Sequence, residues 1–158
     1  MKLLAMILVL VSGNALAVGY QEFNSRFTIP VISDVGTRVY YNCDSVEDRV
    51  EAMLEQMGAQ NIRVRCTGGL DRFNGRFSTA ARVRASYEAL STDVDGGNTT
   101  VSIFNETLTA RGTNCHLVTR AFRAVSKNFE ITSAELPRCR RSSRARARIN
   151  FEVLKEVR

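Results

Sequence analysis

Several features that often identify a function are scarce in this chain. It has one histidine, two prolines and a single long apolar run, which lies at its start. With one histidine and no serine and aspartate pattern around it, the sequence argues against a Ser-His-Asp site. Because no second run approaches the roughly twenty apolar residues of a membrane span, it also argues against a transmembrane segment in the rest of the chain. The remaining composition, 44% hydrophobic and 24% charged, is that of a globular protein with enough apolar material for a core.

The first seventeen residues have the pattern of a secretion signal. Lys2 gives a positive start, residues 3–11 are almost wholly apolar, and residues 15–17 read Ala-Leu-Ala, the small-residue pattern of a cleavage site. The apolar stretch is too short to cross a bilayer. We therefore expect residues 1–17 to be removed and the mature protein to be periplasmic or secreted.

An internal repeat is the most informative pattern in the remainder. Residues 37–43 and 109–115 each end in Asn-Cys and precede a helical pattern, and residues 81–90 and 145–154 share the text A-R-x-R-x-[SN]-[YF]-E-x-L. Landmarks that recur in the same order indicate a duplicated unit. The domains predicted from this repeat are a signal peptide (1–17), an N-terminal arm or edge strand (18–35), a first strand–helix–strand–strand repeat (36–90), a turn or linker (91–100) and a second repeat (101–158).

One buried helical stripe is predicted in each repeat, because apolar residues recur at the spacing of a single helix face. Asp44 and Glu47 fit a capping box at the start of the first helix, and Gly58 fits its end. The stripe positions are Val46, Val50, Met53, Leu54 and Met57 in the first repeat and Val118, Ala121, Phe122, Val125 and Phe129 in the second.

The closing strands 81–90 and 145–154 alternate between apolar and polar residues, which predicts a sheet with one buried face. The predicted fold class is α+β, with the duplicated units forming one mixed sheet and two helices on one face, as in a ferredoxin-like sandwich. A further strand is expected from residue 101, paired with residues 79–90 as a hairpin.

Four cysteines allow three disulfide pairings, and their even number in an exported chain favours disulfides over free thiols. A strand–helix–strand crossover returns parallel to its start, so both strands end at the same edge of the sheet. The repeat then selects one pairing, Cys43 with Cys66 and Cys115 with Cys139.

Arginines on the closing strands are the candidate anion-binding residues, because guanidinium groups suit phosphate, sulfate and carboxylate oxygens. The formal net charge of +6 agrees with an anionic partner. The alternative is a solvated strand face whose charges discourage aggregation. The candidates are Arg82, Arg84, Arg144, Arg146 and Arg148, with Arg63 and Arg65 as an extension.

The segment 67–77 is the largest difference between the repeats. It is a glycine-containing loop at a strand end, where α/β proteins often place ligand contacts. Asp71 and Arg72 are therefore candidate loop contacts, although an ordinary turn accounts for them equally. The loop lacks the Gly-Lys-Ser/Thr ending of a phosphate-binding loop.

No catalytic residue, metal site or cofactor is predicted. His116 follows Cys115, but adjacent residues seldom point at each other, and a disulfide leaves no thiolate for a Cys-His pair. The stretch Asp93–Gly96 lacks the full ligand ladder of a calcium loop. The sequence favours a non-enzymatic, exported, disulfide-braced binding module with an anionic ligand. The alternatives are a small exported enzyme with its site at the 67–77 loop, and a subunit or inhibitor that binds a protein partner.

Overall fold

The computed structural model describes residues 18–34, 37–70, 77–93, 100–139 and 146–157. The predicted signal peptide lies outside these ranges. Within them, no helix is both long enough and apolar enough to cross a membrane. The elements in chain order are β1 (Gly19–Pro30), β2 (Ile32–Asp34), β3 (Thr37–Val39), α1 (Cys43–Gln56), β4 (Gln60–Leu70), β5 (Phe77–Ser91), β6 (Val101–Arg111), α2 (Asn114–Val125), the 3-10 helix η1 (Ser126–Asn128), β7 (Ile131–Glu135) and β8 (Arg146–Glu156).

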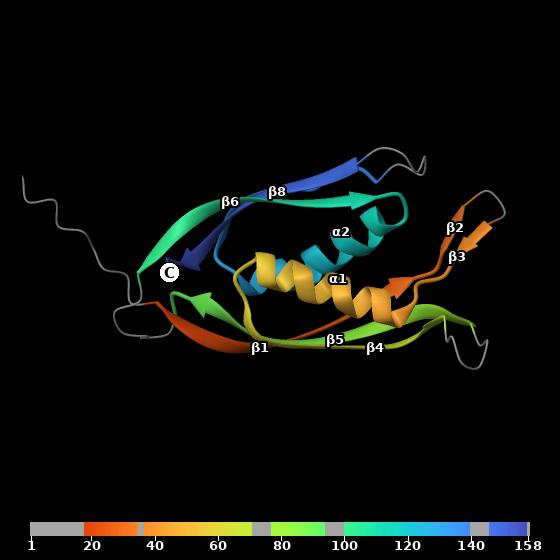
Figure 1. The fold of residues 1–158 in the computed structure, drawn as a ribbon, viewed down its shortest axis with the longest axis horizontal. Coiled ribbons are helices and arrows are strands. Elements are labelled where there is room, and N and C mark those ends of the chain that lie inside the picture. Colours follow the sequence, from red (N-terminus) through yellow and green to blue (C-terminus); the bar gives the residue numbers. More distant parts are fainter. Residues whose placement is uncertain (1–17, 35–36, 71–76, 94–99, 140–145, 158) are drawn as a thin grey trace, which may run out of the picture.

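Over the described residues, the long strands form two separate antiparallel sheets, and both helices lie between them (Figure 1). The first sheet has the order β1-β5-β4 and the second β6-β8-β7, while β2 and β3 make a short hairpin. The α+β class is as predicted. The single mixed sheet with helices on one face is wrong.

The burial of α2 explains why there are two sheets. Adjacent positions are buried at both Leu117–Val118 and Ala121–Phe122, so the apolar surface of this helix is much wider than one stripe. A helix with an apolar surface of that width needs packing partners on more than one side. A sheet on each side of the helix layer supplies them (Figure 1).

Each half of the chain follows the same strand order. A long strand, a helix and two further strands follow one another, and the last strand lies in the centre of its sheet. The two outer strands are therefore parallel to each other but separated by the central strand, a split β-α-β connection. In this arrangement β1 has the place in the first half that β6 has in the second.

The predicted hairpin between residue 101 onward and residues 79–90 is wrong. β6 pairs with β8 along its whole length, from Val101 opposite Glu156 to Arg111 opposite Arg146. Both edges of β5 are already occupied, by β1 on one side and β4 on the other. A central strand has no free edge for a third neighbour.

Helix α1 begins two residues earlier than the predicted capping box requires. Its N-cap is Asn42, whose side-chain oxygen accepts a hydrogen bond of 3.0 Å from the backbone N–H of Asp44. The prediction of Asp44 as the cap is therefore wrong, and Glu47 has a different role, described below. The predicted end is confirmed: Gly58 follows the C-cap Met57 with φ of +90°, the left-handed conformation typical of a glycine there.

The helical stripes and the alternation of the closing strands are confirmed over the described residues. All ten predicted helix-stripe positions are buried. Over residues 81–89 of β5 and 149–153 of β8, the side chains that face the helices are also buried and their neighbours along the strand are not. The alternation ends at Leu90, which is buried like Ala89, and Ala147 of β8 is only half-buried. The buried strand residues are Ala81, Val83, Ala85, Tyr87 and Ala89 on β5 and Ile149, Phe151 and Val153 on β8.

Candidate functional site

Both disulfides of the repeat-based pairing are present. Cys43 is bonded to Cys66 with a Cα–Cα distance of 5.2 Å, and Cys115 to Cys139 with 5.6 Å. The geometry behind the pairing differs from the expected one in the first half. Cys66 lies within β4 and not at its end, and β3 is outside the main sheet.

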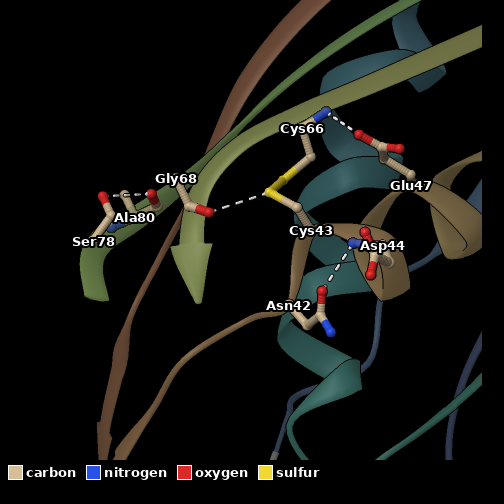
Figure 2. Close-up of a disulfide and its surroundings, with 8 residues drawn as sticks. All are labelled: Asn42, Cys43, Asp44, Glu47, Cys66, Gly68, Ser78 and Ala80. Atoms are coloured by element: carbon tan, nitrogen blue, oxygen red, sulfur yellow. Dashed lines mark hydrogen bonds between the residues drawn. A yellow bond between two sulfur atoms is a disulfide. The ribbon is translucent and has the colours of Figure 1, made fainter. Parts of the chain in front are cut away.

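The first disulfide ties the start of α1 to an edge strand (Figure 2). Beside it, Oε1 of Glu47 accepts a hydrogen bond of 2.5 Å from the backbone N–H of Cys66. Sγ of Cys43 lies 3.3 Å from the carbonyl oxygen of Gly68, a close contact and not a hydrogen bond, because a disulfide sulfur carries no proton. Covalent and polar links thus fix β4 against the helix and hold the first sheet in place.

Two glycines lie near the end of β4, where its pairing with β5 is irregular. Gly68 and Gly69 have φ of +84° and +67°, and a Cβ on Gly69 would overlap the carbonyl oxygen of Tyr41. That oxygen accepts a hydrogen bond of 2.9 Å from the N–H of Leu70. The glycines of the predicted loop therefore have a structural role. Asp71 and Arg72, the candidate loop contacts, lie outside the described residues.

The predicted arginines lie on two separate faces. Arg82 and Arg84 are exposed on the outer face of β5, and Arg146 and Arg148 are exposed on the outer face of β8. Because the helices lie between the sheets, these outer faces point away from each other (Figure 1). Arg144 lies outside the described residues. The candidates therefore do not form one surface.

The first sheet carries the denser arginine group. Arg84 has Arg26 of β1 directly opposite on one side and Arg65 of β4 on the other, so three arginines form one row across the sheet. Directly opposite residues project from the same face, and all three side chains are exposed. In the next row, Arg82 lies between Thr28 and Thr67. We call Arg26, Arg65, Arg82 and Arg84 the first-sheet arginine face.

Among the described residues, the acidic side chains on this outer face are distant from the arginine row. Glu22 and Glu88 share the outer face, but two rows further along the strands, about 13 Å from the arginine row at the usual rise per residue. Among the described residues, no ion pair involves Arg26, Arg65 or Arg84. Like charges directly opposite one another destabilise a sheet, so this row has a repulsion that an anion would relieve.

The second sheet has a smaller group. Arg146 has Arg111 opposite it on β6, and Arg148 has Thr109. A carboxylate is nearer here, because Glu135 of β7 lies opposite Asn150, one row from Arg148. The second face therefore has a pair of facing arginines and not a row of three.

Sequence reasoning missed Arg26 because residues 18–35 are not regularly periodic. The segment was predicted as either an N-terminal arm or an edge strand, so no outer face could be assigned to it. Sequence reasoning also missed Arg120 and Arg123 of α2, whose signal is the recurrence of basic residues along one helix face from His116. His116 is half-buried near the start of α2. Within the described ranges, His, Cys, Asp and Glu form no group that could hold a metal ion.

Comparisons of the chain with protein-family models, with curated proteins and with solved structures find no match. The function is therefore argued from the residues and their arrangement.

Proposed function

We propose that the protein is an exported, non-enzymatic binding module that holds an anionic ligand on the first-sheet arginine face. The observation that carries this proposal is the row of Arg26, Arg84 and Arg65 across three paired strands. Guanidinium groups present several donors in a planar fork, which matches the oxygens of sulfate, phosphate and carboxylate groups.

The spacing of the row favours a ligand with several negative groups. Neighbouring strands lie about 4.8 Å apart, so the outer two arginines of the row start about 10 Å from each other. A single small ion cannot contact all three side chains together without bending them inward. A chain of anionic groups laid across the strands can, so the proposed ligand is a polyanion such as an acidic glycan.

The disulfides support the exported location. All four cysteines are paired, and disulfides persist in oxidising compartments while the cytosol keeps most thiols reduced. The secretion-signal pattern of residues 1–17 points the same way. Bracing also serves the proposed site, because the Cys43–Cys66 bridge anchors β4, which contributes Arg65.

We further propose that the chain consists of two copies of one unit, with the first copy beginning at β1. The common strand order of the two halves and the equivalent positions of their disulfides support this. The second copy then has its own outer arginine pair, Arg111 and Arg146, as a weaker site of the same kind.

Elution from immobilised heparin tests the proposed function. The variant with Arg26→Ala, Arg65→Ala and Arg84→Ala, which we call the first-sheet triple variant, is expected to elute at a clearly lower salt concentration than the parent. These side chains are exposed and repel one another, so the substitutions should leave the unfolding temperature unchanged or slightly higher.

The second sheet supplies a matched control. The variant with Arg111→Ala, Arg146→Ala and Arg148→Ala, the second-sheet triple variant, removes the same number of charges from an equivalent strand face. It is expected to elute between the parent and the first-sheet triple variant. Equal shifts for both variants would mean that only net charge matters, and the proposed site would be wrong.

A further inference from the structure

A groove of about 910 Å³ lies on a different part of the molecule. Its boundaries are the end of β1, helix α2 and the segment 136–139 that follows β7. Phe27, Ile29 and Leu136 give it an apolar lining. Of these, Leu136 is exposed (37%), Phe27 is half-buried and Ile29 is buried. The open apolar surface of the groove therefore comes from Leu136 and Phe27.

The strand that borders the groove has a free edge. β1 is the outermost strand of its sheet, with β5 on one side only. Just after β1, the N–H of Val31 donates a hydrogen bond of 3.0 Å to the carbonyl oxygen of Thr79, which continues the pairing with β5. Because successive residues of a strand direct their backbone groups to opposite edges, the N–H and C=O of Thr28 and Arg26 point to the free edge. The backbone of Pro30 faces the same free edge as that of Thr28, so the N–H that proline lacks is not needed for pairing with β5.

The helix wall of the groove is basic. His116, Arg120 and Arg123 recur along one side of α2 at the spacing of a helix face, and Arg138 lies on the facing segment. All four line the groove, and none of the described residues that line it is Asp or Glu. Among the described residues, no ion pair or hydrogen bond occupies the side chains of the three arginines.

We propose that this groove binds an extended acidic peptide segment of a partner protein, which adds a strand to the free edge of β1. A groove between an edge strand and a helix is suited to this mode, since the strand supplies main-chain hydrogen bonds and the helix contacts alternate side chains of the peptide. Carboxylates on the peptide face that lies over α2 meet Arg120 and Arg123. Apolar parts of the same peptide cover Phe27 and Leu136.

Fluorescence anisotropy with a labelled peptide of alternating Glu and Val tests this site. The expected result is saturable binding that weakens about tenfold in the variant with Arg120→Glu and Arg123→Glu, since two attractive charge pairs become repulsive. The matched control carries Arg111→Glu and Arg146→Glu, the same charge change on the outer face of the second sheet. Its affinity for the peptide is expected to stay within about twofold of the parent's, because its substitutions act on the groove only through the net charge, which salt screens.

Two further arms test the strand addition itself. A peptide N-methylated at the alternate residues that would face β1 cannot donate hydrogen bonds to this strand, and it should bind much more weakly than its parent peptide. The Thr28→Pro variant should bind the unmodified peptide more weakly, since the substitution removes the N–H donor of residue 28 at the free edge. Thermal unfolding checks that the Thr28→Pro variant is folded. Unchanged binding of the N-methylated peptide would show that no strand is added to β1 and would overturn the proposal. Displacement of the peptide by octanoate would show that the groove takes a small amphipathic anion and would overturn it as well.

The two proposals fail separately. The first-sheet triple variant removes no side chain that lines the groove, so it should bind the acidic peptide nearly as the parent does. Loss of heparin binding with retained peptide binding would support both sites. Loss of peptide binding in that variant would mean that the acidic peptide binds the arginine face, and the groove would not be its site.

Discussion

The hydroxyl group of Tyr41 donates a hydrogen bond of 3.0 Å to the carbonyl oxygen of Thr113. Tyr41 lies just before α1 and Thr113 just before α2, so the bond joins the starts of the two helices and, with them, the two halves of the chain. The side chain is buried, and this burial raises the pKa of Tyr41 to about 12.

Tyr41→Phe is expected to lower the free energy of unfolding by about 1 kcal/mol at neutral pH, the usual net contribution of one such bond. The pKa of the tyrosine is raised in the folded state, so its stabilising effect is present below pH 10 and is lost as the pH rises toward 12. Urea unfolding at several pH values checks both points. The parent should lose more stability than Tyr41→Phe across that alkaline range, and parallel losses would contradict the role assigned to Tyr41.

Each disulfide should contribute substantially to stability. The bonds span 23 and 24 residues, and closing loops of that size contributes about 3 kcal/mol in the chain-entropy description. Replacing Cys43 and Cys66 by Ala, or Cys115 and Cys139 by Ala, should therefore lower the unfolding free energy by about 2–4 kcal/mol.

Peptide mapping without reduction is the matching covalent test. It should recover only the two links found in the structure. A link between Cys43 and Cys115 would contradict the repeat-based pairing, even if the double substitutions were destabilising.

Gly69→Ala should destabilise the protein more than Gly58→Ala does. Both glycines have positive φ, which costs a residue with a Cβ about 1 kcal/mol or more. Only at Gly69 would the added Cβ meet a backbone atom, the carbonyl oxygen of Tyr41; at Gly58 it would meet the flexible side chain of Lys155. Thermal unfolding of the two variants measures the difference. Equal effects would mean that the chain after the first disulfide is not held in this close approach.

The parts of the fold that depend on local patterns could be predicted from the sequence. The burial of Val50 and Phe122 follows from the helix period, because one face of each helix must be apolar. The disulfides followed from the repeat, since the nearly equal intervals of 23 and 24 residues in the two copies single out one pairing. The helix cap could not be predicted as reliably, because Asn42 and Asp44 both have suitable side chains and only the backbone decides between them.

In β1, one buried polar residue interrupts the alternation of apolar and polar side chains that identifies a strand. Ser25 lies inward, where the alternation calls for an apolar side chain, and it is only 5% exposed. Its hydroxyl is 3.1 Å from that of Tyr87, and the side-chain amide of Asn128 donates to both. Hydrogen-bond partners from other parts of the chain make the burial tolerable, and these partners cannot be read from residues 18–35 alone. Arg26 was missed for the same reason.

The division into two sheets also lies beyond a local pattern. Alternation shows that β5 and β8 each have one buried face, but it does not show whether the two faces belong to one sheet. For the same reason, the sequence does not show which of the candidate arginines lie on one face. Arg84 and Arg148 look equivalent in the sequence, and only the sheet order shows that Arg84 has an arginine on each side.

Expression of the full chain in a secreting host tests the export signal. N-terminal sequencing of the exported protein should begin at Val18, immediately after the Ala-Leu-Ala pattern. Substitution of Ala15 and Ala17 by Arg should block cleavage and leave uncut precursor. Recovery of the uncut parent chain from the cytosol, with reduced cysteines, would contradict the exported assignment.

The salt dependence of polyanion binding tests the central claim most directly. Fluorescence anisotropy with a labelled heparin fragment, repeated at increasing sodium chloride, gives the slope of log affinity against log salt, which reports how many ion contacts form. The account predicts a steep slope for the parent and a clearly shallower one for the first-sheet triple variant, with the second-sheet triple variant between the two and nearer the parent. The same slope for all three proteins would contradict the assignment of the anion site to Arg26, Arg65 and Arg84.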